Sequence, residues 1–504
     1  MKKLLFILVL LFSSQFLFAQ FEEDALRASR IFNGGTARSA AMGGAFGALG
    51  GDLSSAIGNP AGIGVFRKSE LNFTPMLSFT NTKSAGYGVE RTAFQLANLG
   101  VVMSFPYNND EYSNWKSFNF AVNFANTGNY NRTLDQAVSN SVSSLLDVYR
   151  DYSQGIVSDN LDPFTTGSAY DTYLLNPVGT EGTEYENVLQ TGELVNQFKY
   201  IKERGSSGEF AMSFGANYND KLYVGATMGL TEFEYKMRAS YSEYASETSD
   251  LDHFNKYENQ EIIGFGFNMK FGVIYRPIPQ IRLGAAIHTP SWYTLNYDYR
   301  TEMESYFFKT DQEVGRDKLQ YTTPVYNDNR DVNLRTPWRA ILSAATVIGN
   351  WGILSFDYEY VDYSSAKFGE SSDYASFHEQ NSNIDALYSS AHNFRAGAEV
   401  RLGNIVSLRA GYSFEGTPYK TDGWSFVNSI SGGEKINSLS GGIGLNFGMF
   451  YCDAALTHSS SKDTTVFYYV PATDYGADNS YSSAPIKNKY INNQVRVTFG
   501  MRLF

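Results

Sequence analysis

Cysteine is almost absent from the chain, since Cys452 is the only one in 504 residues. An intramolecular disulfide is therefore excluded, and a lone cysteine is more often a small packed hydrophobe than a reactive thiol. The five histidines stand at no spacing typical of a metal site, and His-Glu-x-x-His and cysteine pairs are missing. We therefore expect no metal and no cofactor.

Signatures of catalysis and of nucleic-acid binding are missing as well. Gly-x-Ser-x-Gly does not occur, and the many serines on predicted strands fit inward polar positions. The net charge of −12 opposes binding to nucleic acid, which requires a basic surface. We expect a protein that is not an enzyme and does not bind nucleic acid.

Long apolar runs are lacking after the first twenty residues. No later run reaches the roughly 18 residues that a spanning helix needs. At the N-terminus, two lysines precede an apolar run at 4–18, and Ala19 follows it. This order is typical of a secretory signal peptide, which we place at residues 1–19. The mature, exported chain is expected to start at or near Gln20.

Aromatic residues and glycine are abundant. The chain has 36 Tyr, 37 Phe and 45 Gly. Aromatic girdles and glycine-rich strands are typical of membrane β-barrels. The mean hydropathy of −0.30 does not oppose this interpretation, because a barrel alternates lipid-facing and lumen-facing residues, whose hydropathies average out.

Strict alternation of apolar with polar or small residues is the strongest signal. It is clear at 263–275, 354–361, 406–414 and 495–503. Such runs of about 9–13 residues match tilted strands that cross a membrane, whereas strands of soluble proteins have about 5–6. Fourteen such segments start near residues 70, 94, 117, 209, 221, 261, 280, 337, 352, 390, 404, 438, 449 and 489.

The connections between these segments alternate in length. Every even-to-odd connection is short, as at Asn219-Asp220, and every odd-to-even one is long, about 13 to 80 residues. This parity predicts a 14-stranded antiparallel transmembrane β-barrel over residues 70–504, with short periplasmic turns and long extracellular loops carrying short helices. Both termini would be periplasmic.

The barrel class also predicts a location and partners. We expect a monomer in the cell outer membrane of a Gram-negative bacterium, surrounded by outer-membrane lipids and lipopolysaccharide. The chain ends in an aromatic residue, Phe504, as a signal for the barrel-assembly machinery would. The alternation places Leu503 instead on the lipid-facing side.

Residues 20–69 do not alternate and are rich in glycine. Apolar side chains such as Met42, Phe46 and Ile63 interrupt the small residues, which indicates packing rather than a solvated leader. About fifty such residues would fit inside a fourteen-stranded lumen. We therefore predict that this segment is a hatch that plugs the barrel.

Two motifs in this segment resemble the hatch of the long-chain fatty acid transporter FadL family: 37–46 (ARSAAMGGAF), and Asp52, Ser55-Ala56 and 59–62 (NPAG). Residues 272–277 with 283–291 are similar to the family's sixth-to-seventh hairpin, and 336–363 to its Bacteroidetes branch. The resemblance implies passive diffusion of long-chain fatty acid-like or aromatic compounds through an internal pocket and a side opening in the wall. The candidate gating residues are Met42, Gly43, Gly44, Phe46, Asn59, Pro60, Ala61 and Gly62.

Five polar residues are candidates for the lumen: Arg38, His288, Asp357, Glu359 and Arg409. Charges out of water are costly unless they are paired. We favour pairing of the strand charges with hatch groups such as Arg38, and packing of His288 against the hatch, over contacts with a ligand.

The external loop 128–208 carries apolar residues at helical spacing, which predicts two amphipathic helices, over 134–152 and 185–201. Their apolar faces either pack together or form a first landing site for hydrophobic ligands. The landing-site residues would be Leu134, Val138, Val142, Leu145 and Tyr149.

One alternative function is left open, namely a surface adhesin or structural barrel without transport. Adhesion would depend on the Tyr- and Asp-rich loops 366–388 and 462–488, whereas transport would depend on the hatch and the wall. A lumen filled by polar side chains would argue against transport.

Overall fold

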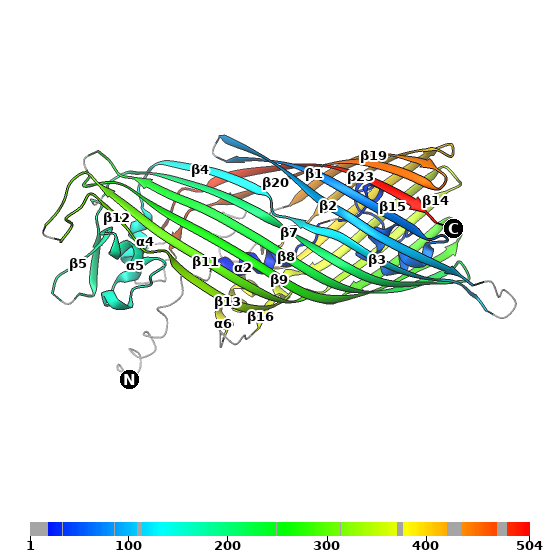
Figure 1. Ribbon diagram of the computed structural model, residues 1–504, viewed down its shortest axis with the longest axis horizontal. Helices are drawn as coiled ribbons and strands as arrows, with labels where there is room; N and C mark the ends of the chain where they lie inside the picture. The colour runs from blue at the N-terminus through cyan, green and yellow to red at the C-terminus, as the bar shows by residue number, and fades with distance from the viewer. Residues whose placement is uncertain are drawn as a thin grey trace.

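The computed structural model of the chain describes residues 19–32, 34–84, 86–107, 113–180, 182–190, 192–247, 249–312, 314–369, 376–420, 435–470 and 481–503. These residues form a closed 14-stranded antiparallel β-barrel (Figure 1). The first strand, β1 (Glu70–Ser84), closes the barrel by pairing with the last, β23 (Ile486–Arg502).

The other twelve wall strands follow in chain order. They are β2 (Tyr87–Pro106), β3 (Trp115–Asn129), β7 (Val195–Tyr218), β8 (Leu222–Tyr244), β9 (Leu251–Ile278), β10 (Ile281–His288), β14 (Arg339–Ile348), β15 (Gly352–Asp362), β17 (Ser390–Leu402), β18 (Val406–Glu415), β19 (Ile436–Phe447) and β20 (Phe450–Thr465). The predicted fourteen-stranded barrel is confirmed, and eleven strands begin within three residues of the predicted position.

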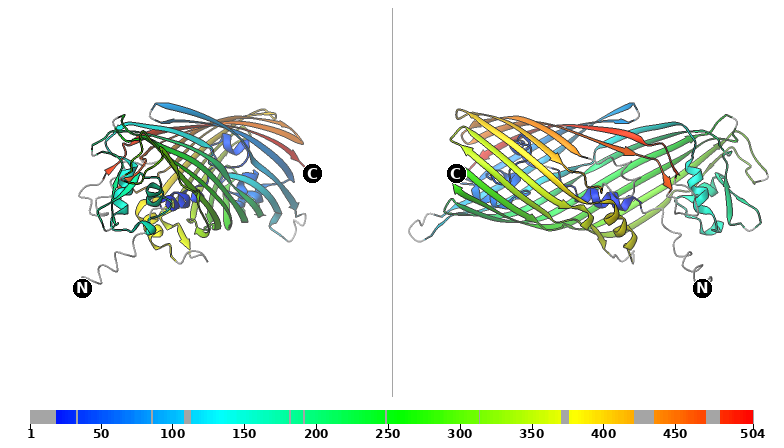
Figure 2. Two further views of the ribbon diagram at one scale, coloured as in Figure 1. Left: turned by 60° about the vertical axis from the view of Figure 1, so that its left-hand side comes forward. Right: turned by 180° about the vertical axis from the view of Figure 1, so that it is seen from behind.

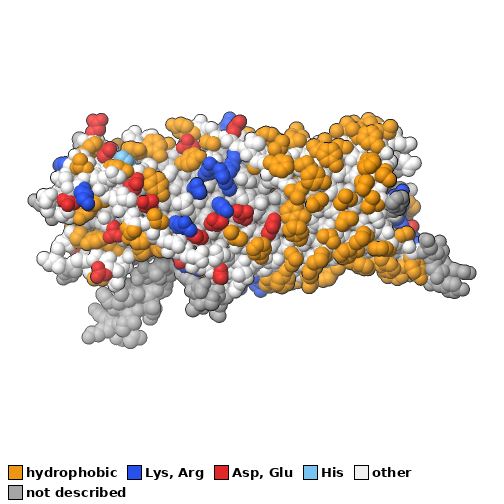
Figure 3. All heavy atoms as spheres, viewed as in Figure 1, with side chains coloured by type: hydrophobic (Ala, Val, Ile, Leu, Met, Phe, Trp, Pro, Cys, Tyr) orange, Lys and Arg blue, Asp and Glu red, His pale blue; other side chains and the backbone are white. Residues whose placement is uncertain are grey.

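An apolar belt covers the outside of the barrel at the end where the C-terminus lies (Figures 1 and 3). On β7, Phe210, Met212 and Phe214 are 37–50% exposed, while Ala211 and Ser213 between them are buried. This alternation places every second side chain in lipid. The belt therefore marks the membrane-spanning part of the barrel.

Tight turns join the strands at the belt end. Asn219, Asp220 and Lys221 connect β7 to β8, the first two with φ of 52° and 56°, and Gly349, Gly403 and Gly448 also have positive φ. Residues with positive φ suit hairpin loops of two or three residues, which must match the twist of the strands that they join. These are the short connections that the sequence predicted.

The barrel wall continues far beyond the belt as a polar extension (Figures 1 and 3). Strands β7, β8 and β9 have 24, 23 and 28 residues, far more than a membrane crossing requires. The prediction that β2, β7 and β9 begin near 94, 209 and 261 is therefore wrong by 7 to 14 residues.

The first external connection differs from the prediction for the same reason. Strands β1 and β2 are joined by residues 85–86 alone, instead of by about 13 residues, because Ser84 pairs directly with Tyr87. The alternation of apolar residues is lost where the outer face of a strand meets water. The ends of these strands could therefore not be predicted from the sequence.

Shorter elements complete the extension. They are β4 (Arg132–Ser141), α4 (Leu145–Ser153), η3 (Ser158–Asn160), α5 (Thr166–Asp171), β5 (Leu175–Val178), β6 (Glu184–Asn187), β11 (Trp292–Phe307), β12 (Gln320–Thr322), β13 (Tyr326–Arg335), η4 (Tyr363–Ser365), β16 (Lys367–Gly369), α6 (His378–Leu387), β21 (Tyr469–Val470) and β22 (Tyr481–Ser482). Among the described helices, none is long and apolar enough to cross a membrane.

The predicted amphipathic helices are mostly wrong. Leu134 and Val138 lie on β4, which pairs with β7, and residues 195–201 belong to β7 itself. A spacing of four residues places two side chains on one face of a strand as well as of a helix, so the pattern was ambiguous. Only Leu145 and Tyr149 of the five landing-site residues are helical, in α4.

Candidate functional site

The N-terminal segment lies inside the barrel (Figures 1 and 2). It comprises α2 (Ala19–Ser29), α3 (Ala37–Ala41), η1 (Leu53–Ala56) and η2 (Pro60–Val65). Side chains of the wall hold its backbone from several sides. The N–H groups of Ala37, Gly43 and Gly47 donate to Thr498 Oγ1 (2.7 Å), Ser440 Oγ (3.1 Å) and Asp357 Oδ2 (2.9 Å), and Asn119 Nδ2 donates to the Ile63 carbonyl (2.7 Å).

A ring of glycines on the inner wall lets the segment approach the strands. A Cβ atom on Gly215, Gly225, Gly284, Gly397 or Gly411 would collide with backbone atoms of residues 42–64. For example, a Cβ on Gly284 would lie 2.6 Å from the Gly47 carbonyl oxygen. Glycine allows such close backbone approach. The segment and the wall are thus packed backbone against backbone at this level.

The predicted gating residues are buried in this packing, apart from a half-buried Gly44. Asn59 is the best connected, because its Oδ1 accepts from the Ala61 N–H and its Nδ2 donates to the carbonyls of Gly47 (2.6 Å) and Val273 (3.2 Å). It therefore caps η2 and ties the segment to β9. Only Gly43 and Gly44 of the set line the large cavity described below. Their role in gating stays a prediction.

Two of the charged lumen candidates pair with acids of the wall strands. Arg38 pairs with Glu399 (3.0 Å), and Arg409 pairs with Glu399 (2.8 Å) and Asp453 (2.5 Å). Sequence reasoning did not single out Glu399, although it lies on the inward register of β17.

The two strand acids have other partners than Arg38. Asp357 accepts the Gly47 N–H, whereas Glu359 pairs with Arg339 (3.0 Å) and Arg395 (3.1 Å) of the wall. Asp357 thus binds a hatch group as expected, although not Arg38, whereas the expected pairing of Glu359 with a hatch group is wrong.

His288 is buried and lies against the segment. Its Nε2 lies 2.6 Å from the carbonyl oxygen of Gly58. A carbonyl only accepts hydrogen bonds, so Nε2 is the protonated nitrogen. The contact is the packing role expected for this histidine, and it leaves His288 outside the large cavity.

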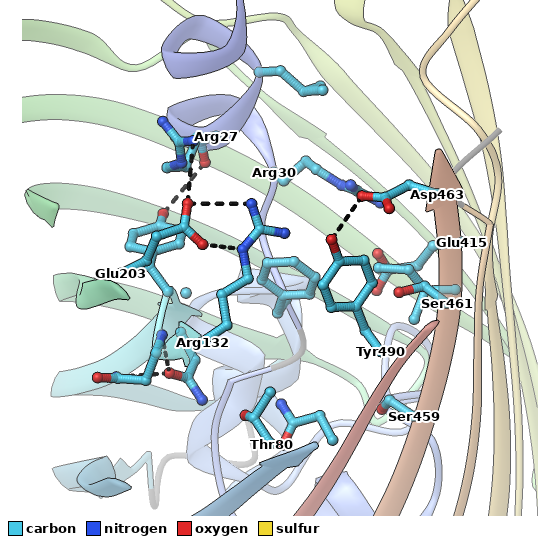
Figure 4. Close-up of a pocket in the computed structure, with 18 of the residues that line it drawn as sticks. Arg27, Arg30, Thr80, Arg132, Glu203, Glu415, Ser459, Ser461, Asp463 and Tyr490 are labelled. Carbon is cyan, nitrogen blue, oxygen red and sulfur yellow. Dashed lines mark hydrogen bonds and ion pairs between the residues drawn. The ribbon is translucent and has the colours of Figure 1, made fainter. Parts of the chain in front are cut away.

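A cavity of about 790 Å³ lies above the packed segment (Figure 4). Gly43, Gly44, Met76 and Arg496 are among its lining residues near the segment. One wall is rich in hydroxyl groups: Ser413, Ser438, Ser440, Thr457, Ser459, Ser460 and Ser461. Apolar side chains line other parts: Leu26, Phe32, Leu134, Ile201, Met237, Leu387, Tyr419, Ile436 and Phe467. The cavity is thus neither filled nor purely apolar.

The charges that border the cavity include a cluster around Glu203. Glu203 pairs with Arg132, lies 3.9 Å from Arg27, and accepts a hydrogen bond from the Tyr235 hydroxyl (2.6 Å). On the opposite side, the Tyr490 hydroxyl donates to Asp463 (2.9 Å) (Figure 4). Paired charges of this kind do not favour a ligand of one sign.

Helix α2 presents two buried acids at the cavity. Asn383 donates to Glu22 Oε1 (2.8 Å), Gln260 donates to Asp24 Oδ2 (3.3 Å), and Arg27 pairs with Asp24. Removal from water raises the pKa of Glu22 to about 7, and burial likewise raises the pKa of Asp24 to about 7 although Arg27 opposes it.

The wall loses its hydrogen-bond ladder on one side of the cavity. β2 pairs with β3 only from Asn98 to Pro106, and its remaining part, Tyr87–Ala97, pairs with β1 alone. β3 shifts register between Asn126 and Gly128, and the chain continues as β4 along β7. Strand β2 therefore has an unpaired edge beside residues 126–129, of which Asn126, Gly128 and Asn129 line the cavity.

The landing-site residues do not form one surface. Leu134 is buried and lines the cavity, whereas Val142 is 83% exposed. Tyr149 is buried in a core that α4 shares with β9 and β11, through Phe254 and Met303. In the adhesin alternative, residues 370–375 and 471–480 of the two loops lie outside the described residues.

Among the described residues, we find no group of three or more His, Cys, Asp or Glu side chains that could hold a metal ion. The one cysteine, Cys452, is half-buried on β20.

Solved structures of the FadL family share this architecture. A Pseudomonas aeruginosa FadL homologue matches with a TM-score of 0.53 and 12% identity, over 94% of this chain and 99% of that one. The toluene transporters TbuX of Ralstonia pickettii (0.50, 15%) and TodX of Pseudomonas putida (0.50, 13%) match over the same shares. No family profile and no curated protein sequence matches the chain. At these identities, the likeness establishes the fold.

Proposed function

We propose that the protein is an outer-membrane channel for the passive uptake of small hydrophobic compounds that carry a polar group. The observation that carries this proposal is the cavity of about 790 Å³, which lies above an occluded lumen and reaches Asn126, Gly128 and Asn129, where β3 stops pairing with β2. A water-filled pore does not fit, because the N-terminal segment is packed backbone to backbone against the wall.

The lining of the cavity supports an amphiphilic ligand. An apolar group gains about 25 cal/mol for each Å² that it removes from water. Ile201, Leu134 and Met237 offer such a surface, and the serines of β19 and β20 offer hydrogen bonds to a hydroxyl, carbonyl or carboxyl group. Fatty acids and oxygenated aromatic compounds have this character.

Two routes out of the cavity are compatible with the wall. A ligand leaves sideways along the unpaired edge of β2, or the N-terminal segment rearranges at Gly43 and Gly44 and acts as a gated hatch. The sideways route requires no movement of the buried segment. We therefore favour it, with the hatch as the floor that stops passage straight through the barrel.

The proposal includes the setting of the protein. The apolar belt and the turns beside the C-terminus suit an outer membrane, with those turns in the periplasm. Insertion by the barrel-assembly machinery, a monomeric state and a source among the Bacteroidetes belong to the same proposal. The structural neighbours named as toluene transporters agree with a hydrophobic ligand.

Narrowing the cavity tests the function. Ile201 lines the cavity, whereas its neighbour Tyr200 is exposed on the outer face of the same strand. In liposomes loaded with a fatty-acid-binding fluorophore, I201W should slow oleate uptake by about tenfold, and Y200W should leave it unchanged. Equal uptake by wild type, I201W and protein-free liposomes would exclude this channel function.

A further inference from the structure

The outer face of β7 and β8 carries a basic patch made of Lys202, Arg204, Lys236 and Arg238. Lys202 lies directly opposite Arg238 in the ladder, and Arg204 lies directly opposite Lys236. Their neighbour Glu203 points inward to the cavity, so these four residues share the outward register. Figure 3 shows basic side chains grouped on this face, next to the apolar belt.

Like charges placed directly opposite each other destabilise a sheet. Nearby acids compensate only part of the patch, because Glu234 and Glu261 both bind Lys236 (3.0 and 2.9 Å). No ion pair is formed by Lys202, Arg204 or Arg238 with any described residue. Two successive cationic pairs on one exposed face suit a ligand with several negative charges.

A fifth cation approaches from another strand. Arg91 of β2 lies near enough to Arg204 for the two charges to repel each other, and its buried Nε has no hydrogen-bond partner. A ligand with negative charge between Arg91 and Arg204 would relieve this repulsion. The patch therefore spans the two sides of the unpaired β2 edge.

The height of the patch identifies the ligand class. On β7 the exposed belt residue Phe210 is six residues from Arg204, and on β8 Leu230 is six from Lys236. At about 3.3 Å per residue and a tilt of about 45°, the patch lies roughly 14 Å above these belt residues. The headgroup layer of a phospholipid leaflet is only about 5–8 Å thick. Phospholipid phosphates would thus lie below the patch.

We propose that the basic patch binds the phosphorylated core sugars of a lipopolysaccharide molecule in the outer leaflet. This ligand has acyl chains that lie along the apolar belt and negative charges at the height of the patch. Tyr200, exposed on the same face, offers a ring to the sugars. The inference rests on the proposed outer-membrane location, and not on the ligand of the cavity.

The test compares lipopolysaccharide binding by the purified full chain and by a K202Q/R204Q/R238Q variant. The matched control, K68Q/K221Q/R276Q, removes three positive charges near the belt-end turns, at the opposite end of the barrel. Native mass spectrometry should show at least a fivefold loss of bound lipopolysaccharide for the patch variant alone. Dephosphorylated lipopolysaccharide should bind wild type as weakly as the intact lipid binds the patch variant.

Several results would overturn the proposal. Equal binding by the patch and control variants would do so, and so would binding of phosphatidylglycerol as tight as that of lipopolysaccharide. Heat-modifiable migration on gels confirms that both variants are folded. Oleate uptake by the patch variant separates the lipopolysaccharide proposal from the channel proposal, because the patch residues do not line the cavity. Loss of lipopolysaccharide binding with normal oleate uptake would support both proposals. Absence of uptake even in the wild type would refute only the channel function.

Discussion

The backbone nitrogen of Gly43 occupies the place that a side chain on Gly411 would need. The Gly43 N–H donates to Ser440 Oγ on the adjacent strand, and Gly43 itself has a φ of 65°. Strand β18 and the N-terminal segment therefore meet without any side chain between them. At this point the seal of the barrel depends on the absence of side chains at Gly43 and Gly411.

A valine at position 411 is expected to break this seal. Its side chain would displace the segment at Gly43, so G411V should raise the ionic conductance of single channels in planar bilayers at least several-fold above wild type. G441V is the control, because a Cβ at Gly441 meets only one neighbouring atom, at 3.7 Å. A conductance of G411V equal to that of G441V would contradict the backbone contact.

Glu399 is expected to be essential for stability, because it is the common partner of Arg38, Arg401 and Arg409. E399Q would leave Arg38 without its ion-pair partner, while Arg409 would keep Asp453, and removal of one partner of a buried pair costs about 3–5 kcal/mol. Urea unfolding in lipid vesicles measures this loss. E90Q, at an exposed position of β2, should change the free energy of unfolding little.

Docking of α2 is expected to weaken as the pH rises. The pKa of Glu22 and of Asp24 is raised to about 7 in the docked helix, whereas a released helix would ionise both at pH values near 4. Between about pH 4 and pH 7 the released state therefore binds fewer protons, so the docked state loses stability with rising pH and then levels off.

Hydrogen exchange measures this effect when it is corrected for the intrinsic rate at each pH. Protection of residues 22–29 should be higher at pH 5 than at pH 8 in the wild type. An E22Q/D24N variant should show no such dependence, since both side chains are then neutral. The same pH dependence in the variant would mean that other groups control the helix.

The packing of residues 142–194 against the wall should depend on one leucine of α4. Leu146 is completely buried in the core that joins α4 to β9 and β11. L146A should cost about 2–5 kcal/mol locally, and proteolysis should then cleave residues 142–194 faster while the barrel stays intact. V142A removes an exposed side chain instead and should leave the cleavage rate unchanged.

Sequence reasoning was strongest where lipid imposes alternation. Phe210, Met212 and Phe214 must face hydrocarbon, so the positions of the wall strands could be read directly. The extension carries no such constraint, because its outer face meets water and its inner face combines apolar side chains, such as Phe233 and Leu295, with polar ones. Leu134 and Val138 therefore fitted a helix as well as the strand they occupy.

The cavity was harder to predict than the fold. Its lining combines residues from α2, β4, β7, β19 and β20, which are hundreds of positions apart, and no local pattern marks them. Glu399 was missed because a single inward acid gives no signal without knowledge of Arg38 nearby. The unpaired edge of β2 depends on register, which composition does not encode.

The hydrogen bond from the Ala37 N–H to Thr498 Oγ1 joins residues 461 positions apart. Ala37 therefore leaves the ribosome long before Thr498. The inner surface of the wall that holds the N-terminal segment is consequently incomplete until β23 is added. Strand β23 also closes the wall against β1. Plugging and closure are thus one late event, and a chain stalled before β23 would expose glycine-rich backbone and an open sheet edge together.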